Sequence, residues 1–220
     1  MFKQPARSVL RKVKKTPKIG RPVTSTPEQQ LAKLIEAAID ILNEQTIDAD
    51  FSMAQIALRA GISKRTVYTL VSSKEELVSH ILKRNIVKTT DVLEADVGNA
   101  ADARSLLTRF LIAWAEVAIA PLTVGLFVMA IRERSRFPSI GTAYYQAGKL
   151  NGVAQLSRWL KRMRERKFLV MDDPLLVADL LLSTTASEPQ RALALGVPTT
   201  LKTKDFEKRI AAIVTLILGP

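Results

Sequence analysis

FSMAQIALRAGISKRTVYTLVSSKEEL, residues 51–77, contains three helix starts in close succession. Each is marked by a serine, Ser52, Ser63 or Ser73, whose hydroxyl can accept a hydrogen bond from an unpaired amide of the first helical turn. Gly61 stands between the first two starts, where a left-handed backbone conformation ends a helix at little cost. The spacing predicts two short helices joined by a tight turn, followed by a longer helix. Glu76 completes a capping box with Ser73 at that last start.

Helix, tight glycine turn and helix make up the helix-turn-helix pattern, in which the first helix braces the second so that the second enters the major groove of DNA. Ile56 and Val67 are expected to face the core between the helices, and the small Ala57 lets them approach. The outward side chains of the second helix include no carboxylate and can donate to base edges or phosphates: Lys64, Arg65, Thr66 and Thr69. The alternative is a helical hairpin with a few solvated bases, and it leaves the caps and the glycine spacing as coincidences.

The same stretch resembles the DNA-binding domain of TetR-type transcriptional regulators, over roughly residues 27–75. The matching elements are Ile-Ala at 56–57, Ala-Gly-Ile-Ser at 60–63, Tyr68, and Ser-Lys-Glu at 73–75, whereas Val71 stands where the family usually has an aromatic residue. The resemblance implies phosphate contacts by Ser52, Tyr68 and Lys74, and base contacts by Lys64, Arg65 and Thr69. Ser63 and Thr66 complete the expected contact set. Tyr68 has an alternative role as a core residue with its hydroxyl at the rim.

Another helix is expected before this motif. Thr26 precedes Pro27 and Gln29, a pattern typical of a capped helix start, and apolar residues then recur at helical spacing until about Glu44. We therefore expect a helix-turn-helix domain over residues 27–88, with the motif itself at about 52–71.

Residues 1–26 form a basic arm with eight Lys or Arg residues and no acid. Three prolines favour an extended, disordered chain. The tract Gly20-Arg21-Pro22 resembles the core of minor-groove AT-hook peptides, so Arg21 is a candidate minor-groove contact. Two alternatives stay open: a disordered tail that adds only nonspecific attraction to phosphates, and a cleaved organelle-targeting peptide.

Composition narrows the functional classes. The chain has 220 residues, 47% of them hydrophobic, and a formal net charge of +12, which favours a polyanionic partner. It has no cysteine and one histidine, so a disulfide framework, a thiolate nucleophile and a multi-histidine metal site are excluded. We expect no catalytic residues, no metal, no cofactor and no enzymatic activity. The absence of a signal-like apolar stretch near the start favours a reducing, cytoplasmic setting.

Residues 89–220 are expected to form a second, larger helical domain. Residues 110–131 are long and apolar enough to span a bilayer, but Glu116 and Pro121 interrupt them, so we interpret them as two buried helices that meet near Ala120 and expect no membrane partner. A helix is expected from about Gly141 to Lys167, ending in a basic cluster interpreted as a solvated helix terminus rather than a second DNA site.

The last two helices are expected to start at Asp173 and Thr203, and both are apolar around much of their circumference. Such helices need a partner on more than one side, so they are candidates for a four-helix dimer interface. The family resemblance implies a small-molecule effector in this domain. Large apolar residues are candidates for lining its cavity, with plain core packing as the alternative: Trp114, Phe127, Met129, Tyr144 and Trp159.

The sequence therefore predicts an all-α protein, with an N-terminal three-helix helix-turn-helix domain followed by a larger helical ligand-binding and dimerisation domain. The predicted function is a homodimeric transcriptional regulator that binds double-stranded DNA at a near-palindromic operator. A repressor released by a small apolar or amphipathic effector fits best. The alternatives are a sequence-indifferent, nucleoid-type DNA-binding protein and a helical enzyme.

Overall fold

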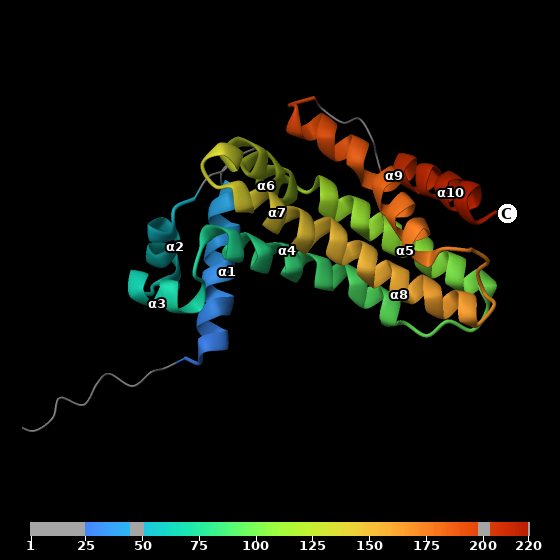
Figure 1. The fold of residues 1–220 in the computed structure, drawn as a ribbon, viewed down its shortest axis with the longest axis horizontal. Coiled ribbons are helices and arrows are strands. Elements are labelled where there is room, and N and C mark those ends of the chain that lie inside the picture. Colours follow the sequence, from blue (N-terminus) through green and yellow to red (C-terminus); the bar gives the residue numbers. More distant parts are fainter. Residues whose placement is uncertain (1–24, 45–50, 198–202, 220) are drawn as a thin grey trace, which may run out of the picture.

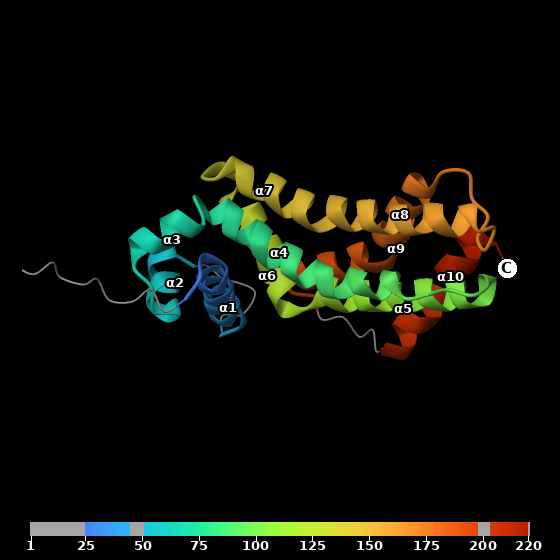
Figure 2. The same cartoon turned by 90° about the horizontal axis from the view of Figure 1, so that it is seen from below.

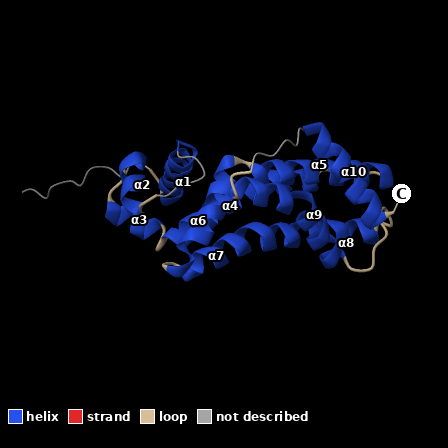
Figure 3. Ribbon diagram, turned by 90° about the horizontal axis from the view of Figure 1, so that it is seen from above, coloured by secondary structure: helices blue, strands red, loops and turns tan. Residues whose placement is uncertain are grey.

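The computed structural model describes residues 25–44, 51–197 and 203–219 (Figure 1). Within these ranges the chain is helical and contains no strand (Figure 3), so the all-α prediction is confirmed. The elements in chain order are α1 (Pro27–Glu44), α2 (Met53–Ala60), α3 (Lys64–Leu70), α4 (Lys74–Thr90), the 3-10 turn η1 (Asp91–Glu94), α5 (Ala100–Ile119), α6 (Pro121–Arg132), the 3-10 turn η2 (Glu133–Ser135), α7 (Pro138–Tyr145), the π-helical turn η3 (Gln146–Leu150), α8 (Asn151–Glu165), α9 (Pro174–Ala194) and α10 (Thr203–Leu218).

The helix starts are held by the side-chain caps expected from the sequence. The Thr26 hydroxyl accepts from the Gln29 amide at 3.3 Å while the Gln29 side chain accepts from the Thr26 amide at 3.0 Å. Asp173 accepts from the amides of Leu175 and Leu176 at the start of α9. These bonds satisfy amides that have no partner inside the helix, so they fix where each helix begins.

One cap differs in detail from the prediction. At the start of α4 the Ser73 hydroxyl accepts from the Glu76 amide at 3.2 Å, as expected. The Glu76 carboxylate reaches one residue further back, where it accepts from both the amide and the hydroxyl of Ser72 at 2.7 Å. These hydrogen bonds lower the pKa of Glu76 below its usual value, because they stabilise the ionised carboxylate.

A first apolar core joins the N-terminal helices to α6 and α7. Its N-terminal members come from α1 to α4 and include Leu34, Ile56, Val67 and Leu77, all fully buried. The same core continues through buried residues of α6 and the α7–η3 segment: Leu122, Leu126, Met129, Ala130, Ile140 and Ala147. The N-terminal helices therefore pack against α6 and α7 as one apolar unit.

A second apolar core lies between α5, α8, α9 and α10 and includes the fully buried Phe110, Leu156 and Leu181. Arg104 of α5 donates to the carbonyls of Leu218 and Gly219, which holds the end of α10 against α5. α2 and α3 lie at one end of the molecule and α10 lies towards the other, with α4 and the α7–α8 segment running along its length (Figures 1 and 2).

The helix expected from about Gly141 to Lys167 is present in a modified form. It begins earlier, at Pro138, and continues from α7 through η3 into α8 as one rod (Figure 2). Its middle, Gln146–Leu150, is a π-helical turn that the apolar spacing did not indicate. Such turns insert an extra residue into a helix and are frequent at functional sites.

The basic end of α8 is anchored more than expected. Arg162 donates to the Leu93 carbonyl at 3.2 Å, and Arg164 donates to the Asp172 carbonyl at 2.8 Å. Arg166 lies 3.9 Å from Asp96 and over the ring of Phe168. Four of the five cations, Lys161, Arg162, Arg166 and Lys167, are exposed, which agrees with a solvated terminus, and the contacts also join the end of α8 to neighbouring loops.

The apolar segment 110–131 is divided between α5 and α6, as expected. α5 ends at Ile119 and α6 begins at Pro121, and the two helices are bent by 57° at this break. Among the described residues, no helix taken alone has the length and apolar character needed to cross a membrane; the bent α5–α6 pair meets those criteria only when its halves are counted together.

Candidate DNA-binding surface and interior cavity

The turn between α2 and α3 depends on Gly61. This residue has φ 67° and ψ 30°, a left-handed conformation that favours glycine. Its amide donates to the carbonyl of Leu58 at 3.2 Å, and the Ile62 amide donates to the Ala57 carbonyl at 3.0 Å. This pair of bonds satisfies two carbonyls at the end of α2 and directs the chain into α3 within three residues.

α3 presents one face to the core and the opposite face to solvent. Val67 is completely buried, whereas Lys64, Arg65 and Thr69 are exposed and Tyr68 is 57% exposed. The exposure of Tyr68 disagrees with its alternative role as a core residue. The structure therefore brings these four side chains together on one outward edge.

The hydroxyl groups near this edge are already partly used within the protein. Ser63 Oγ accepts from the Thr66 amide and lies 2.8 Å from Thr66 Oγ1, and Thr69 Oγ1 donates to the Arg65 carbonyl. Ser52 Oγ accepts from the Gln55 amide in a complete capping box, which leaves its hydrogen free to donate. Contacts from Thr66 and Thr69 to DNA would therefore replace or share an internal bond.

Val71 and Lys74 follow α3 in the chain, Val71 directly after it and Lys74 at the start of α4. Lys74 Nζ lies 4.8 Å from the centroid of the Phe51 ring, a cation–π contact that directs this half-buried ammonium at the start of α4. Val71, which stands in place of the usual aromatic residue, is 1% exposed and part of the first core. Arg21, the candidate minor-groove contact, lies outside the described residues.

An interior cavity of about 380 Å³ lies where the two cores meet, a size within the usual range for small-molecule sites. It is bounded by α4, α5, α6, the α7–η3 segment and α9. Its apolar lining is formed by Leu82, Ile86, Trp114, Val117, Ala118, Phe127, Leu182 and Ala186, and its polar lining includes Asn85, Thr123, Tyr144, Lys149, Ser183, Ser187, Gln190 and Arg191.

Three of the five predicted effector residues line this cavity: Trp114, Phe127 and Tyr144. The rings of Phe127 and Tyr144 lie side by side, with centroids 5.7 Å apart. Met129 and Trp159 are not among the lining residues. Both are fully buried in the cores, Met129 in the first and Trp159 in the second, so the core-packing alternative describes them better.

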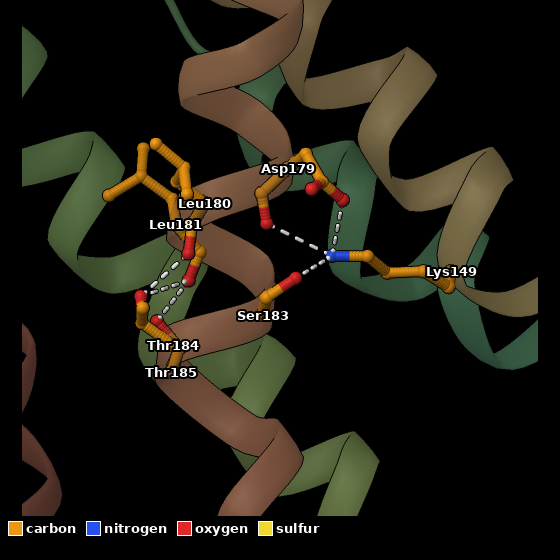
Figure 4. Close-up of polar contacts among 7 residues, drawn as sticks. All are labelled: Lys149, Asp179, Leu180, Leu181, Ser183, Thr184 and Thr185. Atoms are coloured by element: carbon orange, nitrogen blue, oxygen red, sulfur yellow. Dashed lines mark hydrogen bonds and ion pairs between the residues drawn. The ribbon is translucent and has the colours of Figure 1, made fainter.

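Several polar residues of the cavity were not predicted. Lys149 belongs to the π-helical turn, and its ammonium contacts the Asp179 carbonyl at 3.0 Å, the Asp179 carboxylate at 2.9 Å and the Ser183 hydroxyl at 2.6 Å (Figure 4). Gln190 donates to the Tyr144 hydroxyl and to the Ala118 carbonyl. Gln190 lies within α9, and neither helical spacing nor a capping pattern singled it out as a cavity residue.

A second concave surface, a groove of about 710 Å³, lies between α1 and α4. It is wider and more open than the interior cavity. Charged side chains line much of it, among them Glu36 and Arg84, which pair with each other across it. The interior cavity is the better small-molecule candidate because it is more enclosed and has aromatic walls.

No group of three or more potential metal ligands occurs within the described parts of the chain. The functional candidates in the structure are thus the edge of α3 and the cavity between the cores.

Comparisons with known proteins identify the family. Residues 34–81 match the model of bacterial regulatory proteins of the tetR family, and residues 105–219, more than half of the chain, match the C-terminal domain of AefR-like transcriptional repressors. Comparison with curated proteins gives no match.

Solved structures share the fold. A protein from Mesorhizobium loti assigned to the TetR family has 21% identity and a TM-score of 0.69, over 88% of this chain and 96% of that chain. The flavonoid-responsive regulator FrrA has 25% identity and a TM-score of 0.61, over 86% and 95%. A TetR transcriptional regulator from Agrobacterium tumefaciens has 17% identity and a TM-score of 0.67, over 87% and 95%. Because family models match residues 34–81 and 105–219 in a chain that has the helix-turn-helix geometry described above, this protein belongs to the TetR family of DNA-binding transcriptional regulators.

Proposed function

We propose that the protein is a homodimeric repressor that binds a near-palindromic operator and is released from it by a small molecule bound in the interior cavity. It would act on DNA in the cytoplasm. Members of the family bind DNA and dimerise. The operator contacts, the dimer interface and the effector proposed here are specific to this chain.

The observation that carries the proposal is the exposed edge of α3. Lys64 and Arg65 are exposed cations at the start of a helix whose opposite face is anchored by the buried Val67. A guanidinium can bind the O6 and N7 atoms of guanine in the major groove, so Arg65 is the strongest candidate for a base contact. Ser52, Ser63, Thr66, Tyr68, Thr69 and Lys74 would complete the surface, mostly through phosphates.

The basic arm would add to the affinity of this surface. Residues 1–26 carry eight cations, which attract phosphates whatever the base sequence. Arg21 is the residue of the arm proposed to enter the minor groove.

Exposed apolar residues on α9 and α10 support a dimer interface. Arg209 of α10 donates to the Thr184 carbonyl of α9 at 3.1 Å, so this pair marks where the two helices meet. Leu180 lies one turn before Thr184 and is 42% exposed, and Leu216 lies two turns after Arg209 and is 86% exposed. Helical spacing places Leu180 on the same face of α9 as Thr184. It likewise places Leu216 on the same face of α10 as Arg209. Burying these leucines against a second copy would remove apolar surface from water.

The position of α4 supports coupling between the cavity and the DNA surface. Its residues Leu82, Asn85 and Ile86 line the cavity, and its first turn follows α3 directly. In that first turn Glu75 accepts a hydrogen bond from Ser139 of α7 at 2.8 Å. A ligand that moved α4 relative to α5 or α9 would therefore move α3, which is the proposed reading helix. Such a ligand releases the operator only if it binds the DNA-incompetent arrangement more tightly.

Competition binding tests the proposal. The purified full-length protein, bound to a labelled duplex from the DNA upstream of its own coding region, is challenged with unlabelled specific or scrambled duplexes at one stated salt concentration. We expect the specific duplex to compete at least about a thousandfold better than the scrambled one. Equal competition would instead indicate a nucleoid-type protein that binds DNA without sequence preference.

A further inference from the structure

One residue of the cavity lining, Thr123, has a buried hydroxyl without a hydrogen-bond partner. Thr123 is 6% exposed and lines the cavity, and its Oγ1 has no hydrogen-bond partner. Thr123 lies in the first turn of α6. The carbonyls three and four residues earlier belong to Ala120, which caps α6, and to Ile119, which ends α5, and the Thr123 hydroxyl bonds to neither. Thr185 of α9 shows the usual solution, because its equally buried hydroxyl donates to the Leu181 carbonyl (Figure 4). An unpaired buried hydroxyl is costly, so a ligand that pairs with it gains affinity.

A second donor in the cavity comes from Tyr144. Its hydroxyl oxygen accepts from Gln190 Nε2 at 3.2 Å, so its hydrogen remains available to donate to a ligand. Burial raises the pKa of Tyr144 to about 12 and keeps the phenol protonated at neutral pH. Its ring also packs against Phe127, which places the donor beside an aromatic wall.

The two cations of the cavity lining are already neutralised. The Lys149 ammonium has three partners, and these match its three N–H groups. Arg191 pairs with Glu188 and lies in an exposed position. A carboxylate entering the cavity would lose its hydration without meeting an unpaired positive charge.

We propose that the cavity binds an uncharged aromatic compound that carries hydroxyl groups, with its ring between Trp114 and Phe127 and its oxygens paired with Thr123 and Tyr144. This inference rests on the proposal that the cavity is the effector site. The apolar walls account for the ring. The unpaired Thr123 hydroxyl and the free hydrogen of the Tyr144 hydroxyl account for the oxygens, and the paired cations select against an anion.

Calorimetric titration of the full-length protein, without DNA, tests the ligand class with three probes of similar size. Methyl 4-hydroxybenzoate is neutral and has a phenol, 4-hydroxybenzoate is an anion, and methyl benzoate lacks the hydroxyl. We expect the neutral phenol to bind at least about tenfold more tightly than the anion and about threefold to tenfold more tightly than the ester without a hydroxyl. Tighter binding of the anion, equal binding of all three, or no binding of any at millimolar concentration would overturn the proposal.

Thr123→Val tests the role of the unpaired hydroxyl. We expect this variant to bind methyl 4-hydroxybenzoate about threefold to tenfold more weakly while its melting temperature stays equal or rises, because no internal bond is lost. Thr108→Val is the control, since the Thr108 hydroxyl donates to the Arg104 carbonyl on α5 and does not line the cavity. A lower melting temperature for Thr123→Val, or unchanged affinity, would contradict the assignment.

Tyr144→Phe tests the second donor, and we expect it to weaken the neutral phenol by a similar factor while methyl benzoate changes less. An equal loss for both probes would contradict a hydrogen bond from Tyr144 to the hydroxyl. Operator release is measured separately with the same phenol. Selective binding without release would overturn the proposed effector function and leave the ligand class standing.

Discussion

The two apolar cores of this protein do not coincide with the N-terminal and C-terminal parts of the chain. The first core joins α1 to α4 with α6 and the α7–η3 segment, and the second joins α5 with α8, α9 and α10. The reading helix thus packs in one core with elements from the middle of the chain, whereas the proposed dimer surface lies on the other. The cavity lies between the two cores, so in the proposed function a bound ligand would change how one core is placed against the other.

The strongest test of this division changes the second core's outer face. We expect Leu216→Glu to convert the dimer to a monomer, because it places a charge in the proposed interface, and to weaken operator binding about hundredfold or more through loss of the second reading helix. Light scattering and operator titration measure the two effects. Val170→Glu is the matched control, since Val170 is 85% exposed and lies outside α9 and α10. A dimer that survives Leu216→Glu would remove this residue from the interface.

A change on the first core's outer face should leave assembly intact. We expect Arg65→Ala to weaken operator binding by about tenfold to hundredfold and to change binding to random duplexes little, because a base contact is lost. Arg158→Ala on α8 removes the same charge far along the chain and serves as control. If operator and random DNA lose affinity equally, Arg65 contacts a phosphate instead.

A third change acts at the cavity wall. A Cβ added to Gly152 of α8 would lie 2.3 Å from the Trp114 ring, so the ring must shift. We expect Gly152→Ala to lower the free energy of unfolding by about 1–3 kcal/mol, measured by denaturant titration. Gly141→Ala is the control, because nothing lies within 4 Å of its added Cβ. If the two variants have equal free energies of unfolding, the Trp114 ring can shift without loss of stability.

The smallest expected effect concerns the start of α4. Hydrogen bonds from Ser72 lower the folded-state pKa of Glu76 from its usual value of 4.5. A lowered pKa contributes stability above the unfolded pKa, and this contribution is lost as the pH falls through the folded value. Melting temperatures followed from neutral pH to about pH 3 should therefore fall more for the wild type than for Glu76→Gln. Parallel curves for both proteins would contradict the contribution of Glu76.

The two regions also differ in how far the sequence predicts them. The caps at Thr26, Ser52 and Ser63 and the turn at Gly61 are interactions within a few residues, so local sequence specifies them. The division of the apolar stretch at Pro121 was predictable for the same reason. The second domain was predicted as helices with approximate ends and a candidate set of cavity residues.

The details that were missed depend on distant partners. The π-helical turn places Lys149 next to Asp179 and Ser183, which lie thirty or more positions later in the chain. The local spacing of residues does not predict such a contact. Thr123 is unusual because its buried hydroxyl has no hydrogen-bond partner, which depends on the packing of several helices and cannot be read from local sequence. Met129 and Trp159 are large apolar residues of the kind expected in a cavity wall. The packing of the helices instead places their side chains inside the two cores.

Selection from a pool of random DNA duplexes tests the central claim most directly. The full-length protein is bound to the pool, and the retained duplexes are amplified and sequenced over several rounds. We predict enrichment of one two-fold-symmetric sequence whose half-sites are centred one helical turn, about 34–36 Å, or a multiple of it apart. Arg65→Ala should reduce the base preference at equivalent positions of both half-sites. A pool that stays random, or a retained sequence without two-fold symmetry, would contradict a dimer that reads DNA through α3.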